Sequence, residues 1–139
     1  MSSVFYKTAD AFKDILNSQS FNDIQLSAVV DLVPDYSSEK IKNLTVVVTP
    51  DTVTSDIVTF DGNERVRTVS IGLMDRIKQN ELDNHIAIVE EIMDKLESED
   101  RLPDDLGSII LVEADPLYDI DRMRSKKIFV SILKVTVKC

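Results

Sequence analysis

The sequence predicts an α/β (α+β) domain in which two main helices pack on one face of a mostly antiparallel sheet. Two observations predict this class. Residues 4–17 and 81–96 each place apolar side chains on one helical face, and several short runs rich in β-branched residues lie between turn-forming residues. An apolar helix face has to be covered, and a sheet is the natural cover. A chain of 139 residues can bury one core, so we expect a single domain over residues 1–139.

The first predicted helix covers residues 4–17, and Ser2 or Ser3 can cap it by accepting a hydrogen bond from an amide of the first turn. Its apolar face consists of Phe5, Ala9, Phe12 and Leu16. Residues 24–33 are rich in β-branched side chains and predict the first strand. Residues 36–43 predict a short helical turn between this strand and the next.

The second predicted strand is a continuous β-branched run over residues 44–49, which ends at Pro50. A run of this kind is typical of a strand that is buried on both faces. Residues 51–56 are mostly Asp, Thr and Ser, and we expect them to form a loop.

A β-hairpin is predicted from two runs, 57–60 and 65–74, on either side of Asp61 and Gly62. Glycine at this point allows a positive φ without steric cost. Apolar residues alternate with polar or small ones along the second arm, at Val69, Ile71 and Leu73. We therefore expect one face of the second arm to be buried.

The helix predicted at 81–96 has one apolar and one acidic side. The apolar side carries Leu82, Ile86, Val89, Met93 and Leu96. The acidic side carries Asp83, Glu90, Asp94 and Glu97, with Glu91 at its border. His85, the only histidine, projects to the apolar side, and we expect a satisfied, partly buried ring rather than a general base. The acidic side is either a solvated face or a surface that contacts a subunit or a lumen.

The C-terminal part predicts a strand at 108–112, a polar turn or short helix at 115–125 and a last strand at 127–138. In the last strand the apolar positions change from even to odd numbers, from Ile128, Val130 and Ile132 to Leu133, Val135 and Val137. Such a change predicts a bulge, or a strand whose far end packs against another surface, for which a neighbouring subunit is one candidate.

Charge is unevenly distributed along the chain. The net charge of −9 argues against sequence-independent binding to nucleic acid, which needs Lys and Arg to replace counterions. Acids dominate residues 81–105, whereas residues 122–138 contain six bases and no acid. The candidate basic contact residues are Arg122, Arg124, Lys126 and Lys127. Acidic and basic surfaces on one chain could pair between copies, although solvation explains either surface alone.

No residue pattern is typical of an enzyme. Neither a Gly-x-Ser-x-Gly turn nor a Walker or dinucleotide fingerprint occurs. Asp115, Asp119 and Asp121 resemble part of a calcium loop that lacks its glycine and bidentate glutamate, so we expect turn and capping roles, with Asp115 at a helix start. The only cysteine, Cys139, allows no intrachain disulfide. We assign no catalytic, cofactor-binding or metal-binding residue.

The location expected from the sequence is intracellular. No apolar run approaches the roughly 18 residues of a membrane span. The N-terminal residues also lack the basic-then-apolar pattern of a secretory signal.

The order of elements and several phrases resemble the tail terminator (tail completion) proteins of long-tailed bacteriophages. The resemblance covers nearly the whole chain and has no invariant signature. The stretches that carry it are the N-terminal helix, Leu44-Thr-Val-Val-Val-Thr-Pro50, Val69-Ser-Ile-Gly-Leu-Met-Asp-Arg76, the acidic helix from His85 to Leu96, the turn from Asp115 to Asp119, and Phe129-Val-Ser-Ile-Leu-Lys-Val-Thr-Val137.

The resemblance implies a virion structural protein that forms a hexameric ring at the head–tail junction, after assembly in the host cytoplasm. Its expected partners are copies of itself, the tail tube protein and the head connector or a neck protein, with DNA passing through the lumen without sequence-specific binding. The same features fit other small head-to-tail joining proteins. Two other classes stay open: a cytosolic α/β ligand-binding or regulatory module, and a small enzyme that holds a metal at Glu90, Glu91 and Asp94.

Overall fold

The computed structural model describes residues 3–32, 44–59, 62–77, 79–99, 101–103 and 106–138. Its helices are α1 (Val4–Asn17), α2 (Leu82–Ser98) and α3 (Ile120–Lys126), with a 3-10 turn η2 (Gln79–Glu81) before α2. Its strands are β1 (Ser20–Phe21), β2 (Ile24–Gln25), β3 (Ala28–Val30), β4 (Thr45–Thr59), β5 (Gly62–Arg76), β6 (Ser108–Ala114) and β7 (Ile128–Lys138).

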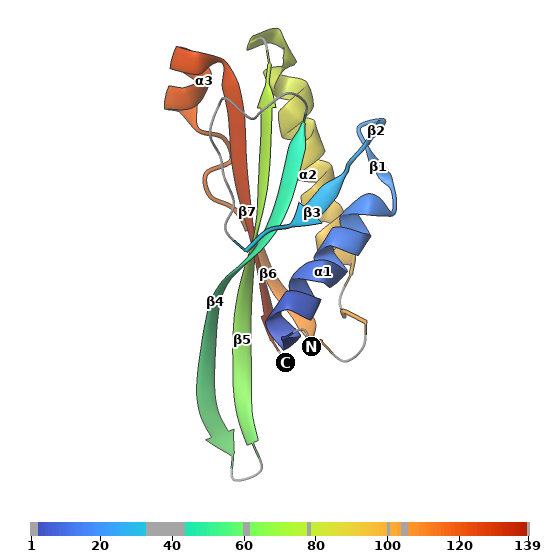
Figure 1. Cartoon of the computed structure of the whole chain (residues 1–139), viewed down its shortest axis with the longest axis vertical. Coiled ribbons are helices and arrows are strands. Elements are labelled where there is room, and N and C mark those ends of the chain that lie inside the picture. Colours follow the sequence, from blue (N-terminus) through green and yellow to red (C-terminus); the bar gives the residue numbers. More distant parts are fainter. Residues whose placement is uncertain are drawn as a thin grey trace.

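A five-stranded sheet in the order β3-β4-β5-β7-β6 forms the body of the molecule (Figure 1). Strand β3 runs parallel to β4, and all other neighbours in this sheet are antiparallel. The buried sides of α1 and α2 join one face of the sheet in a single apolar core, which includes Phe12, Ile92, Ile71 and Leu133. The predicted fold class is therefore confirmed.

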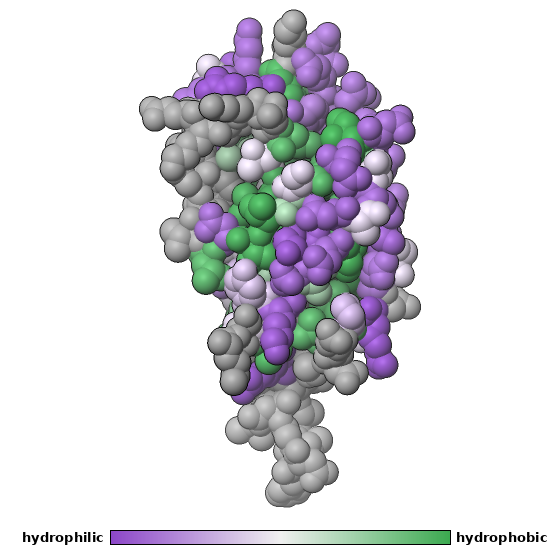
Figure 2. Space-filling view, turned by 45° about the vertical axis from the view of Figure 1, so that its right-hand side comes forward, coloured by the Kyte–Doolittle hydropathy of each residue, from purple (hydrophilic) through white to green (hydrophobic). Residues whose placement is uncertain are grey.

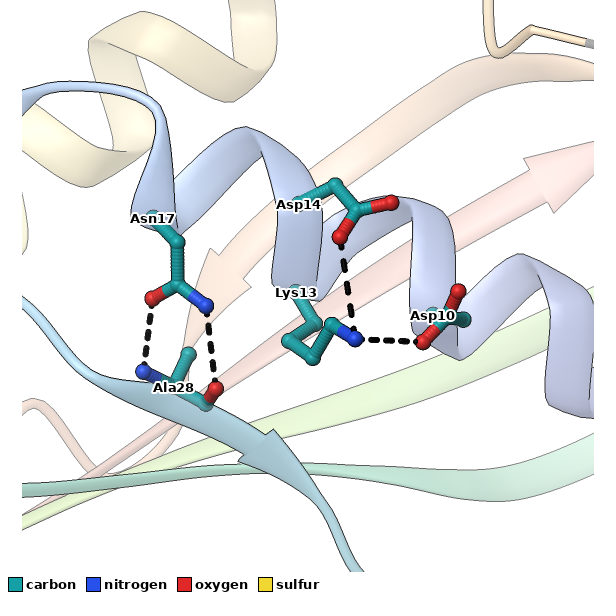
Figure 3. A network of polar contacts seen from close by, with 5 residues as sticks. All are labelled: Asp10, Lys13, Asp14, Asn17 and Ala28. Carbon is teal, nitrogen blue, oxygen red and sulfur yellow. Dashed lines mark hydrogen bonds and ion pairs between the residues drawn. The ribbon is translucent and has the colours of Figure 1, made fainter.

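Helix α1 has the predicted bounds, and of the two candidate caps it uses Ser3. The Oγ of Ser3 accepts a hydrogen bond from the amide of Tyr6 at 3.0 Å. At the other end Asn17 fastens the helix to the sheet edge (Figure 3). Its Oδ1 accepts from the amide of Ala28 at 2.7 Å, and its Nδ2 donates to the carbonyl of Ala28 at 3.1 Å.

The exposed side of α1 carries a small charge network, also drawn in Figure 3. The Nζ of Lys13 lies 2.7 Å from a carboxylate oxygen of Asp10 and 3.6 Å from one of Asp14. The hydrogen bond to Asp10, together with the charges of both carboxylates, raises the pKa of Lys13 above its ordinary value. The network is at the surface and does not reach the core.

The single strand predicted at 24–33 is wrong, because this stretch contains two short strands. Strand β2 pairs with β1 in a separate two-stranded sheet, and β3 joins the main sheet beside β4. Asn22 and Asp23 form the turn between β1 and β2 with φ of 48° and 63°. Asn and Asp tolerate this left-handed region better than other residues with side chains, so the tight turn is possible. The helical turn predicted at 36–43 lies outside the described residues.

The loop predicted at 51–56 is also wrong, because β4 continues through Pro50 to Thr59. The register with β5 shifts between Pro50 and Thr52, so Asp51 occupies a bulge. Proline is tolerated at a bulge because its missing amide need not join the ladder. Asp51 is also engaged there, since its Oδ2 accepts a hydrogen bond from the Oγ of Ser70 at 2.7 Å.

The predicted hairpin is confirmed, although both of its strands are longer than expected. Thr59 pairs with Gly62 at the tip. The far end of the hairpin, residues 55–59 and 62–65, is called the arm below. Strand β7 pairs with β5 only as far as Val66, and β3 pairs with β4 only near its start. Within the described chain, the two strands of the arm therefore pair only with each other and project beyond the helices (Figure 1).

The bulge predicted in β7 is wrong, since its register with β5 is continuous over the whole strand. The register shift lies instead in β6, between Ile109 and Leu111. The change of apolar positions in β7 has a different cause, because both faces of the strand bury side chains. Leu133, Val135 and Val137 belong to the main core, whereas Ile128 and Val130 form a second cluster with Met74.

Helix α3 begins at Ile120, and its cap is Asp119 rather than the predicted Asp115. An oxygen of Asp119 accepts from the amide of Arg122 at 3.1 Å. The helix does not begin at Asp115, because the residues that follow it form backbone hydrogen bonds with β7. The amide of Asp115 donates to Ile132 at 2.9 Å, and the amide of Ile132 donates to Pro116 at 3.1 Å. The peptide bond between Asp115 and Pro116 is cis.

Candidate subunit interface

The acidic side of α2 is exposed over the length of the helix. All five of its predicted members lie at the surface: Asp83, Glu90, Glu91, Asp94 and Glu97. The opposite side is buried, with Ile88, Val89 and Ile92 at 1% exposure or less. Figure 2 turns the side of α1 and α2 forward and shows hydrophilic side chains crowded over it, with hydrophobic ones between them. The five carboxylates therefore form one surface, called the acidic ridge below.

Part of the acidic ridge supports the fold. The Oε2 of Glu91 accepts a hydrogen bond from the amide of Asn22 in the β1–β2 turn. The Nδ2 of Asn22 donates to the carbonyl of Asn84 at 3.3 Å. Glu91 thus holds the small β1–β2 sheet against α2, a role that sequence reasoning did not identify.

A hollow of about 490 Å³ lies beside this contact, between the β1–β2 sheet and α2. Its lining is mainly polar and includes Asn22, Asp23, Glu91, Asp94 and Lys95. It is therefore not the concave apolar site between helix and main sheet that a small-molecule binding module would use.

The predicted basic residues lie on and after α3. Arg124, Lys126 and Lys127 are exposed, and Arg122 is half-buried. Arg124 and Lys126 occupy the last turn of the helix, where a positive charge interacts favourably with the helix dipole. Lys127 follows with a φ of 56° and ends the helix.

Two of these bases border a cavity with a mixed apolar and polar lining that sequence reasoning missed. The cavity has a volume of about 250 Å³ and lies between the first residue of α2 and α3. Its lining consists of Leu82, Tyr118, Ile120, Met123, Arg124 and Lys127. The spacing of Ile120 and Met123 was the available signal, because residues three apart share one side of a helix.

A second apolar surface lies on β6, at one edge of the sheet. Ile110 and Leu111 are 54% and 50% exposed. Two consecutive exposed apolar residues are unusual in a strand, whose side chains normally alternate between faces. The bulge explains them, because it interrupts the alternation between Ile109 and Leu111.

His85 is buried and satisfied, as predicted. Its Nε2 lies 2.9 Å from Oδ2 of Asp75, and its Nδ1 lies 3.1 Å from the carbonyl of Glu81. Its ring meets Phe129 edge-on, with centroids 5.3 Å apart. Both ring nitrogens are therefore engaged, and the side chain joins α2 to β5 and β7.

Arg67 is a buried charge that sequence reasoning also missed. It is 5% exposed, and its Nη1 has no hydrogen-bond partner among the described residues. The alternation along β5 could have found it, because Arg67 lies two residues before the buried Val69 and so shares its face. Val137 pairs with Arg67 from the neighbouring strand.

In the part of the chain that the structure describes, no group of three or more His, Cys, Asp or Glu side chains is arranged to hold a metal ion. Among the described helices, none has the length and apolar character required to cross a membrane. No protein-family model and no curated protein matches this chain.

Proposed function

We propose that this chain is a virion structural protein that forms a hexameric ring at a bacteriophage head–tail junction. The ring caps the tail tube and joins it to the head connector, and DNA passes through its lumen without sequence-specific binding. The proposal combines the family resemblance of the sequence with one structural observation. That observation is the arm, which projects from the body without other strands of the described sheet beside it.

An arm of this kind is suited to contact another subunit. A two-stranded ribbon is only marginally stable in water by itself, because it has no sheet face to bury. Its strand edges also offer unpaired backbone groups to a partner. Both costs are removed when the ribbon lies against a neighbouring copy, as it would in a closed ring.

The separation of charge supports the same role. The acidic ridge lies on α2, and the exposed bases lie on α3 and at its end. Unlike surfaces on one protomer can form a heterologous contact, which closes into a ring when the rotation between copies allows it. Carboxylates that line such a ring repel phosphate, so DNA can pass without adhering.

The proposal is tested by mass and by tail assembly. Native mass spectrometry of the assembled protein should give about six copies, the closed ring expected from heterologous contacts. Added to polymerising tail tubes, the protein should stop their growth and appear as a ring at one end in electron micrographs. A chain that stays a single copy and never joins tubes would contradict the proposal.

Shortening the arm tests the observation on which the proposal depends. Replacing residues 56–64 by Asn-Gly closes the hairpin after the pair Ser55 and Arg65 with a two-residue turn. We expect a folded protein, with the far-ultraviolet circular dichroism of a mixed α/β chain, that no longer forms the ring. A shortened variant that assembles and caps tubes like the parent would remove the arm from the interface.

A further inference from the structure

We propose that the cavity between α2 and α3 receives the bulged edge strand β6 of a second copy of this chain. This contact specifies which surfaces meet in the proposed ring, and in that sense it rests on the proposed function. A different observation supports it. The cavity lies near the first residue of α2, the exposed strand surface lies near its last turn, and the two have complementary side chains.

The receiving surface is a cavity that combines three apolar side chains with Tyr118 and two cations. Leu82, Ile120 and Met123 supply its apolar lining, within a volume of about 250 Å³. Met123 is 8% exposed, whereas Ile120 is 54% exposed, so the cavity has a buried floor and an open side. The two cations in its lining, Arg124 and Lys127, are both exposed.

The entering surface has the complementary composition. The bulge in β6 leaves Ile110 and Leu111 exposed side by side. Glu97 of α2 lines the hollow beside them. Glu113 is exposed two residues beyond Leu111 and faces the same side of the strand. Glu113 pairs with Lys134 on the sheet face away from the core, whereas Glu97 lies on the side of α2. The two apolar side chains thus have one carboxylate on each side of the sheet edge.

One chain cannot bring these two surfaces together, so the β6 surface that we assign to the cavity belongs to a second copy. The cavity includes the first residue of α2, whereas Glu97 lies in the last turn of the same helix. A helix of this length separates them by about 20 Å. The β6 surface is also a partly exposed apolar strand at a sheet edge, which proteins normally cover or pair. The cavity of a second copy covers it with apolar contacts and pairs its carboxylates with cations.

Charge reversal tests the contact in both directions. One variant carries Arg124→Glu and Lys127→Glu, which makes the cavity border acidic. A second carries Glu97→Lys and Glu113→Lys, which makes the strand surface basic. Each variant alone should self-associate at least tenfold more weakly than the parent in sedimentation equilibrium. An equal mixture should regain the parent's mass, because each reversed surface then meets its opposite.

A control reverses one exposed charge of each sign on α1, with Lys7→Glu and Asp14→Lys, so that the net charge is unchanged, and it should keep the parent's mass. A third variant, Ile110→Ser with Leu111→Ser, leaves the charges unchanged and should weaken association by a similar factor. Circular dichroism and thermal unfolding verify that every variant is folded.

Several results would overturn the contact: single variants with the parent's mass, a mixture that stays dissociated, or a parent that remains a single copy at the highest concentration. If the parent forms a dimer that the same substitutions weaken, the contact is supported and the ring is contradicted. A single-copy parent that still caps tail tubes would overturn the contact and leave the proposed function standing.

Discussion

Gly107 precedes β6 in a conformation that only glycine adopts without strain. Its φ is +123°, and a Cβ built on it would lie 2.6 Å from the carbonyl oxygen of Lys138 and 2.9 Å from a methyl carbon of Val137. Its own carbonyl accepts a hydrogen bond from the amide of Leu102 at 2.8 Å. Because position 107 carries no Cβ, its backbone can approach that of Lys138 closely, and this contact fixes where the edge strand begins.

Substituting Gly107→Ala should therefore destabilise the fold strongly. Both the positive φ and the clash with backbone atoms oppose the new side chain, and we expect a loss of about 2–4 kcal/mol in the free energy of unfolding. Urea denaturation followed by circular dichroism measures it. Ser108→Ala, at the next position, is the control and should change stability by under about 0.5 kcal/mol. Equal stability of the two variants would contradict the strained geometry.

Replacing Arg67, in contrast, should stabilise the fold of the single chain. Its buried guanidinium has an Nη1 without a partner among the described residues, and burying charge without compensation is costly. Arg67→Met keeps most of the apolar stem, so we expect the free energy of unfolding of the dissociated chain to rise by about 1 kcal/mol or more. Thermal and urea unfolding at low protein concentration measure this change.

The exposed Arg65, two residues earlier on β5, provides the comparison for Arg67. Arg65→Met should leave stability within about 0.5 kcal/mol of the parent, as is usual for surface substitutions. A clear loss of stability in Arg67→Met would mean that the guanidinium contributes more through its other contacts than its unpartnered nitrogen costs.

At the scale of elements, helices were easier to predict than strand ends. Helical periodicity is a local property, so the residues that face the core in α1 and α2 could be identified in the sequence. Strand ends depend on partners. Pro50 and Asp51 look like a loop, yet the ladder to β5 and the bond from Ser70 keep them in β4. No local pattern contains that information.

In the candidate interface, too, local sequence reveals some features, whereas others depend on tertiary pairing. The acidic and basic residues were visible as runs of charge, and the structure places most of them at the surface. The cavity beside Arg124 was not visible, because it depends on where α3 sits. That position is set by backbone bonds between residues 115–119 and β7, such as Asp119 to Val130 at 2.9 Å. Tertiary pairing, rather than composition, creates the apolar lining.

The cap of α3 gives a test at this scale. Asp119→Ala removes the acceptor for the amide of Arg122, which should cost about 0.5–2 kcal/mol of stability. A helix of seven residues depends strongly on its cap, so the cavity it lines should loosen, and self-association should weaken as well. Asp121→Ala, in the first turn of the same helix, is the matched control. If both substitutions cost the same, the side chain of Asp119 does not act as a cap.

At the scale of the whole molecule, a chain with a net charge of −9 has to overcome its own repulsion before copies associate. The proposed contacts do so by placing the exposed bases of α3 against carboxylates of a neighbour. In the proposed assembly, neighbouring copies cover the arm and the β6 edge, which a single chain leaves exposed. Self-association should therefore respond to salt in a way that reveals which charges meet.

Salt should weaken association of the parent and strengthen that of the variant with Arg122→Glu and Arg124→Glu. The screening length falls from about 30 Å at 0.01 M salt to about 3 Å at 1 M. In the parent this screening removes attraction between the bases of α3 and the carboxylates of a neighbouring copy. In the variant Lys126 and Lys127 remain, but two of the four bases have become acids. Repulsion from the neighbour's carboxylates then outweighs the remaining attraction, so the same screening removes repulsion and leaves the apolar contacts. Sedimentation equilibrium across this salt range measures both trends. Parallel slopes for parent and variant would mean that the basic residues of α3 do not face carboxylates of a neighbouring copy.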